Sequence, residues 1–152
     1  MRNRHLAVAG ALMTTVALGS AQPAAGQVFS PPCFESGGGR IVAANGDQAT
    51  FGGSGSNVGT PDTGHQIYVD HGPATQLRFA SITTVFVLCD PDGRHAEIVG
   101  TGRVDTTEAP EQIVQYRIEV FDRQTTDFYR ITFGAYDSGL QPVIGNINVH
   151  AR

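Results

Sequence analysis

The sequence predicts an all-β fold, an antiparallel β-sandwich or barrel of about eight or nine short strands. Polar and apolar residues alternate with a period of two along most of the chain beyond residue 36, which is typical of strands with one buried face. Clusters of Gly, Pro, Asn and Asp separate these runs. No run beyond the N-terminal segment has the apolar spacing of a long helix.

The clearest alternation spans residues 112–137 and predicts a central hairpin. Two runs rich in β-branched and aromatic residues are joined there by the polar stretch 122–126. On the solvent face, Arg117, Glu119 and Arg130 are expected to pair across the strands. The apolar face is expected to hold Val114, Tyr116, Ile118 and Val120 from the first run, and Tyr129, Ile131 and Phe133 from the second.

The same criteria place further strands on both sides of this hairpin. Asn45-Gly46 predicts a tight hairpin turn, because both residue types tolerate positive φ. The Gly- and Ser-rich residues 52–64 predict a long surface loop, and the nearly all-apolar residues 84–89 predict a strand covered on both faces. Gly100-Thr101-Gly102 indicates a bulge or close packing. The strands are expected at residues 40–44, 48–51, 65–71, 77–89, 95–104 and 143–150.

The N-terminal residues 1–26 have the pattern of a secretory signal peptide. Arg2 and Arg4 precede an apolar run over residues 6–18, and small residues follow. The apolar run is short for a bilayer span, so we expect export and cleavage, after Ala21 or Gly26, rather than a retained membrane anchor. The protein is then secreted or extracytoplasmic, with no membrane span after cleavage.

Residues 27–36 are expected to form a leader, and residues 37–152 a single domain large enough for one core. All ten basic residues are Arg, they are not clustered, and the net charge is −4. Nucleic-acid binding needs a basic face, so that class is excluded.

The chain has two cysteines, Cys33 and Cys89. In an exported protein with two cysteines, the simplest expectation is that they form a disulfide. The alternative is a pair of free thiols with one of them buried in the sheet.

The order and spacing of several short motifs resemble the post-COAP-1 domain, an all-β module of secreted bacterial proteins. The resemblance covers nearly all of residues 37–152, and one departure is Arg40, where such domains often carry Trp. It implies an extracellular all-β module and no particular activity. The motifs are Gly37-Gly38-Gly39-Arg40-Ile41, Ala49-Thr50-Phe51-Gly52, Leu77-Arg78-Phe79, Gly100-Thr101-Gly102, Tyr116-Arg117-Ile118, Asp127-Phe128-Tyr129-Arg130-Ile131, Tyr136-Asp137-Ser138-Gly139 and Gly145-Asn146-Ile147-Asn148-Val149-His150.

Three patterns superficially resemble metal or phosphate sites, and we expect no metal and no cofactor at any of them. His65 and His71 flank a strand beside Asp70, but six residues of strand span about 20 Å, too far to share one ion. Asp90, Asp92 and Glu97 lack the full pattern of a calcium loop. Residues 54–59 are Gly-rich, yet no Lys and no helix follow them.

The expected function is a non-catalytic structural or recognition role at the cell exterior, with a glycan or another exterior protein as partner. Tyr68, Phe121 and Phe128 depart from the apolar faces of their strands, so they are candidates for an exposed binding surface; the alternative for them is packing against a second sheet. The rival function is a small secreted hydrolase of a polysaccharide or ester, with its carboxylates drawn from Glu97, Glu119 and Asp127.

Overall fold

The computed structural model describes residues 30–73 and 76–152, and in these residues it contains strands and no helix. All strand pairs are antiparallel and belong to one sheet, in the order β10-β1-β2-β3-β4-β5-β6-β7-β8, with β9 paired to β7. This confirms the predicted all-β class. The strands are β1 (Cys33–Val42), β2 (Gln48–Ser56), β3 (Thr63–Asp70), β4 (Leu77–Cys89), β5 (His95–Thr106), β6 (Gln112–Phe121), β7 (Phe128–Phe133), β8 (Tyr136–Asp137), β9 (Gln141–Pro142) and β10 (Ile144–Ala151).

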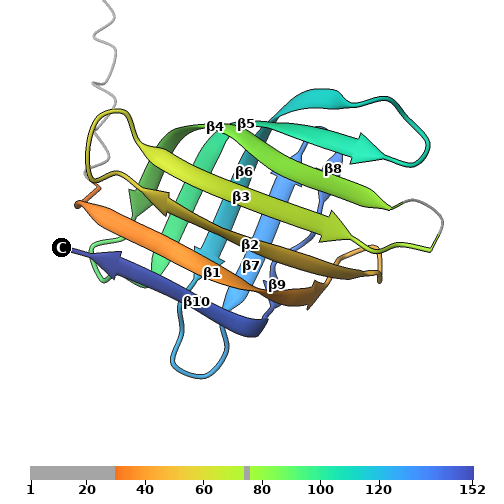
Figure 1. Ribbon diagram of the computed structural model, residues 1–152. Helices are drawn as coiled ribbons and strands as arrows, with labels where there is room; N and C mark the ends of the chain where they lie inside the picture. The colour runs from red at the N-terminus through yellow and green to blue at the C-terminus, as the bar shows by residue number, and fades with distance from the viewer. Residues whose placement is uncertain (1–29, 74–75) are drawn as a thin grey trace, which may run out of the picture.

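The sheet curls into a half-barrel. Figure 1 shows β10, β1, β2 and β3 as a front wall, with β5, β6 and β7 crossing behind it. The predicted central hairpin is β6–β7, in which Ile118 lies opposite Ile131 and Val120 opposite Tyr129. Its predicted apolar face does point into the space between the walls, because all but one of its members are buried and Val114 is packed against them.

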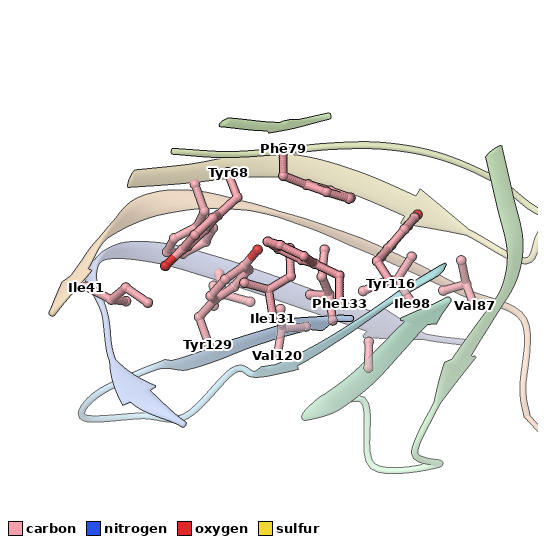
Figure 2. Packing of buried hydrophobic residues seen from close by; sticks show 14 of the residues in the cluster. Ile41, Tyr68, Phe79, Val87, Ile98, Tyr116, Val120, Tyr129, Ile131 and Phe133 are labelled. Atoms are coloured by element: carbon pink, nitrogen blue, oxygen red, sulfur yellow. The ribbon is translucent and has the colours of Figure 1, made fainter. Parts of the chain in front are cut away.

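Aromatic side chains from the two walls meet in the interior, as Figure 2 shows. The ring centroids of Phe51 on β2 and Tyr129 on β7 are 3.9 Å apart. Phe79 on β4 lies 5.4 Å from Phe133 and 5.0 Å from Tyr116. Burying one such side chain stabilises a fold by about 1.5–3 kcal/mol. These contacts between the walls therefore supply much of the force that keeps the sheet curled.

The last strand is joined to the hairpin loop by carboxylates instead of by a neighbouring strand. The backbone N–H of Ile147 donates to Asp127 Oδ2 at 2.8 Å, and that of Val149 donates to Asp122 Oδ2 at 3.0 Å. The N–H of Val143 also donates to the carbonyl oxygen of Asp127, at 2.9 Å. These donors face away from β1, so the two Asp side chains satisfy groups that would otherwise be left unpaired at a sheet edge.

The first strands differ from the prediction. β1 begins at Cys33, inside the predicted leader, and β2 continues to Ser56, into the predicted long loop. The Gly-rich composition suggested a loop, but here it permits close packing of strands. A Cβ on Gly39 would lie 2.8 Å from the Ile144 carbonyl oxygen, and one on Gly55 would lie 3.2 Å from the Val87 side chain.

The prediction that residues 84–89 are covered on both faces is wrong. The pairing of β4 with β5 skips Ile82 and Val85, so β4 contains two irregularities of the β-bulge kind. Val85 is 59% exposed and Phe86 is 36% exposed. Each bulge changes which face the following residue occupies, and the apolar run could not reveal this. Opposite the bulges, Gly100 and Gly102 pack closely against Tyr116 and Phe79, as the glycine motif predicted.

Cys33 and Cys89 form the predicted disulfide, with their Cα atoms 6.2 Å apart and both residues buried. It joins the start of β1 to the end of β4, two strands that are not neighbours in the sheet. Disulfides belong to oxidising compartments, so this bond fits an exported protein.

The predicted signal peptide, residues 1–26, lies outside the described residues. Across the described ranges, the structure has no helix with the length and apolar character to span a membrane.

Replacing both cysteines with Ala is expected to lower the free energy of unfolding by about 2–4 kcal/mol, because the bond closes a loop with a sequence separation of 56. Urea titrations of the double variant and of the wild type, each with and without reductant, would measure this. Reductant should destabilise the wild type alone, and an equal response of both proteins would contradict the prediction.

Asp127→Asn is expected to lower the free energy of unfolding by about 1–3 kcal/mol. Both oxygens of Asp127 accept backbone N–H groups, from Arg123 and from Ile147, and an Asn amide can replace only one of these acceptors. Chemical denaturation would be compared with Asp105→Asn, which changes an exposed carboxylate on β5. Equal stabilities of the two variants would argue against a role for Asp127 in holding β10.

Candidate functional site

Tyr68 lies in the interior, so the prediction that it contributes to an exposed surface is wrong. The residue is 0% exposed. Its hydroxyl is 2.6 Å from that of Tyr136, which in turn donates to Asp70 Oδ2 at 2.8 Å. Both chain neighbours of Tyr68 are apolar, so alternation could not show which face of β3 is buried. The outward residue is Ile67, which is 46% exposed.

Phe121 and Phe128 lie together on the outer face, half-buried at the β6–β7 turn and directly opposite each other in the register. The guanidinium carbon of Arg123 lies over both rings, 5.2 Å from the centroid of Phe121 and 5.0 Å from that of Phe128. On the β5 side, the ring of His95 stacks on Phe121 with centroids 4.4 Å apart. We call these four residues, His95, Phe121, Arg123 and Phe128, the Arg123 stack.

The backbone on either side of Arg123 is held in place by hydrogen bonds. Its own N–H donates to Asp127 Oδ1 at 3.0 Å, and the N–H of Asp122 donates to the carbonyl oxygen of Arg94 at 2.9 Å. The two carboxylates that anchor β10 belong to this same loop. In Figure 1 the loop projects beyond the lower ends of β6 and β7. Arg123 is therefore presented on a constrained loop, with its side chain exposed to solvent.

A surface hollow of about 390 Å³ lies beside the Arg123 stack. A second hollow, of about 260 Å³, lies on the side of the loop that faces β10, and Arg123, Gln124 and Thr125 line both. The residues lining the first hollow are Asp90, Asp92, Arg94, His95, Phe121, Arg123, Gln124 and Thr125.

The lining of the first hollow combines carboxylates, which accept hydrogen bonds, with guanidinium groups, which donate them. Asp90 lies 3.3 Å from His95 Nδ1, and Asp92 Oδ1 accepts the backbone N–H of Arg94 at 3.0 Å. The His95 Nε2 atom is buried without a hydrogen-bond partner in the described structure. The hydrogen bond between Asp92 and the Arg94 backbone stabilises the β4–β5 turn. Glu97, the third acidic residue considered for calcium, is bonded instead to Arg117.

The carboxylates considered for hydrolysis each have a partner. Glu97 and Glu119 bind Arg117 at 2.9 and 3.2 Å, and Glu119 also lies 3.4 Å from Arg130. Arg130 in turn binds Asp137 at 2.6 Å and holds the pKa of that carboxyl below its usual range. The predicted cross-strand pairing is thus confirmed for Glu119 and Arg130, whereas the cross-strand partner of Arg117 is Glu97. Asp127 is occupied by two backbone N–H groups.

His65 and His71, for which the sequence predicts no shared ion, have separate surroundings in the structure. His65 is exposed on β3, and His71, beyond the end of that strand, has its Nε2 atom 3.0 Å from Thr50 Oγ1. Within residues 30–73 and 76–152, no three His, Cys, Asp or Glu side chains are close enough together to hold a metal ion.

The sequence analysis missed an interior carboxyl, Glu35. It is 3% exposed on β1, and its Oε2 atom accepts from Gln66 Nε2 at 3.2 Å. Burial raises its pKa to about 7, against a smaller lowering by the Gln66 hydrogen bond. Tyr129, also in the interior, has a buried hydroxyl without a partner in the described structure. Neither hollow beside the Arg123 stack is lined by Glu35.

The signal that could have revealed Glu35 is weak. Cys33, Glu35 and Gly37 share one face of β1, but that face carries no large apolar side chain before Ile41. A single Glu in a Gly- and Ser-rich stretch has the composition of a solvated segment, and only the pairing of β1 between β2 and β10 places it inside.

The fold and this surface define a class of protein: an all-β domain with a curled antiparallel sheet, one disulfide, and a mixed-charge hollow on its outer face. Comparison with protein-family models, with curated proteins and with solved structures gives no match. The resemblance to the post-COAP-1 domain therefore stays a prediction that rests on the sequence motifs.

Glu35→Gln is expected to remove a pH dependence of stability. Between about pH 4.5 and 7 the folded chain keeps a proton on Glu35 that the unfolded chain has released, so the free energy of unfolding falls as the pH rises through this window. The total change is about 3 kcal/mol. Urea unfolding at several pH values should show the wild type losing this stability relative to the variant.

The matched control is Glu108→Gln, which neutralises an exposed carboxyl in the β5–β6 loop. Its stability should follow that of the wild type across the same window. A constant difference between wild type and Glu35→Gln from pH 4.5 to 8 would contradict the assignment.

Proposed function

We propose that this protein is an exported, non-catalytic recognition module that binds a glycan in the hollow beside the Arg123 stack. The observation that carries the proposal is the composition of that hollow, where the rings of His95 and Phe121, two guanidinium groups, two carboxylates and two uncharged polar side chains line one concave surface. Binding sites combine apolar walls with a few placed polar groups.

The hydrogen-bonding groups of the hollow suit a saccharide. Sugar hydroxyls both donate and accept hydrogen bonds. They can donate to the carboxylate oxygens of Asp90 and Asp92, and they can accept from the guanidinium N–H groups of Arg94 and Arg123. Gln124 and Thr125 offer both kinds of group from an exposed loop. Because the adjoining hollow shares that loop, a chain of sugar residues could contact both sides of it.

Export is part of this proposal. It is supported by the signal-peptide pattern of residues 1–26 and by a disulfide between two buried cysteines. The absence of catalysis is supported by the engagement of Glu97 and Glu119 in ion pairs and of Asp127 in backbone hydrogen bonds. A partner protein at the same surface is the other recognition mode that the sequence predicted.

The rival function, a small hydrolase, is favoured by one observation. Glu35 is a buried carboxyl whose pKa burial raises to about 7, the property of a general acid at neutral pH. It has Gln66 as its side-chain partner, not a second carboxylate or a His. We therefore prefer binding to hydrolysis.

Calorimetric titration of the purified chain with cello-, chito- and galacturonate oligosaccharides is expected to show binding of at least one of them. Gln124→Ala combined with Thr125→Ala should weaken that binding by about tenfold, because both residues line the hollow and are exposed. Gln115→Ala combined with Thr107→Ala is the matched control at exposed positions away from it.

Three outcomes would contradict the proposal. The first is the absence of binding to every saccharide of the panel. The second is an equal loss in both double variants, which would place the contact elsewhere. The third is release of reducing ends that disappears in Glu35→Gln, which would favour the hydrolase.

A further inference from the structure

We propose that Arg123 is the receptor for a carboxylate of the ligand, so that the hollow selects acidic saccharides over neutral ones. This inference rests on the proposed function and names the class of ligand. Three observations support it: one guanidinium group lies over two rings, it has no carboxylate partner in the described structure, and the hollow carries other charges.

The two rings hold the guanidinium group in place. Its carbon is at nearly the same distance from the Phe121 and Phe128 centroids, 5.2 and 5.0 Å, and His95 supports Phe121 from the β5 side. Cation–π contacts of this kind engage the face of a guanidinium group, so the N–H donors at its edge stay available. Because hydrogen bonds hold the loop and the two rings hold the side chain, the protein loses less conformational entropy when a ligand binds.

Arg123 differs from the three Arg residues on the outer face of β5, β6 and β7. Arg117 and Arg130 are bound to carboxylates on their own or adjacent strands, and Arg103 lies 3.4 Å from Glu111. In the described ranges, no Asp or Glu oxygen lies within 4.0 Å of the Arg123 guanidinium group. A constrained Arg without a carboxylate partner is suited to binding a planar anion through two parallel hydrogen bonds.

The acidic side chains of the hollow decide which anion fits. Asp90 and Asp92 lie in the same lining as Arg94 and Arg123, so a densely charged polyanion such as a polyphosphate or a nucleic acid would be repelled there. An acidic sugar carries one carboxylate per residue and several hydroxyls. Its carboxylate can face Arg123 while its hydroxyls donate to the aspartates.

The test compares an oligogalacturonate with its fully methyl-esterified form of equal length, which keeps the size and hydroxyls but removes the charge. The wild type should bind the acid at least about tenfold more tightly than the ester. Arg123→Gln should bind the two forms alike. Arg123→Lys keeps the charge but not the fork of donors, so it should lose most of the preference.

Arg103→Gln, an exposed Arg on β5 that has a partner, should keep the preference of the wild type. The Nε–H resonance of Arg123, assigned by its loss in the Arg123→Lys variant, should shift on titration with the acid and not with the ester. Thermal unfolding of each variant would show that the fold is retained.

The outcomes separate this inference from the function on which it rests. Equal affinity of the wild type for acid and ester would overturn the inference and leave glycan binding standing. A preference that persists in Arg123→Gln would also overturn it, as would tighter binding of a sulfated oligosaccharide than of the uronate. Absence of binding to both forms, together with a blank panel of neutral saccharides, would overturn both proposals.

Discussion

The structure depends on how the curled sheet is kept closed. One side of the gap is β10, where the backbone N–H groups that face away from β1 have no strand beside them, and the other side is the β6–β7 loop. Asp122 and Asp127 span it with charge-assisted hydrogen bonds, which are roughly twice as strong as neutral ones. With the gap spanned, aromatic residues of the front wall reach those of the back wall, as Phe51 reaches Tyr129.

The same closure constrains the candidate site. Asp127 binds β10 with one oxygen and the backbone of Arg123 with the other, so the loop that completes the sheet is also the loop that presents Arg123. Phe121 and Phe128, at the two ends of that loop, form the outer surface against which the guanidinium group lies. A binding group on a constrained loop is held close to one geometry, which is what selective recognition needs.

The interior and the outer surface use polar residues in opposite ways. On the outside, Arg117 and Arg130 bind carboxylates in a ladder across β5 to β8, where solvent keeps the contribution of each pair small. Inside, Glu35 has one amide partner, and burial raises its pKa. It therefore stays protonated to a higher pH than an exposed carboxyl would. Such a group weakens the fold at neutral pH compared with a neutral residue of the same shape.

Several expectations from sequence agree with the structure because they depend on neighbours along the chain. The hairpin of β6 and β7, the buried faces of both strands, and the Glu119–Arg130 pairing follow from alternation with period two. The disulfide follows from there being two cysteines, and the close packing at Gly100 and Gly102 from their place inside a strand. Phe121 and Phe128 break the apolar pattern of their strands, and both lie half-buried on the outer face.

The sequence by itself therefore determined the class of fold, the central hairpin and the disulfide, since strand patterning and cysteine number are local or compositional properties. The tertiary structure decided which face of β3 is inside, where the β4 bulges fall, and that the glycine-rich residues of β1 and β2 are strands. It also placed Glu35 in the interior and Arg123 over two rings. These features depend on strands and loops that are distant in the chain, and alternation along one strand carries no information about what lies opposite it.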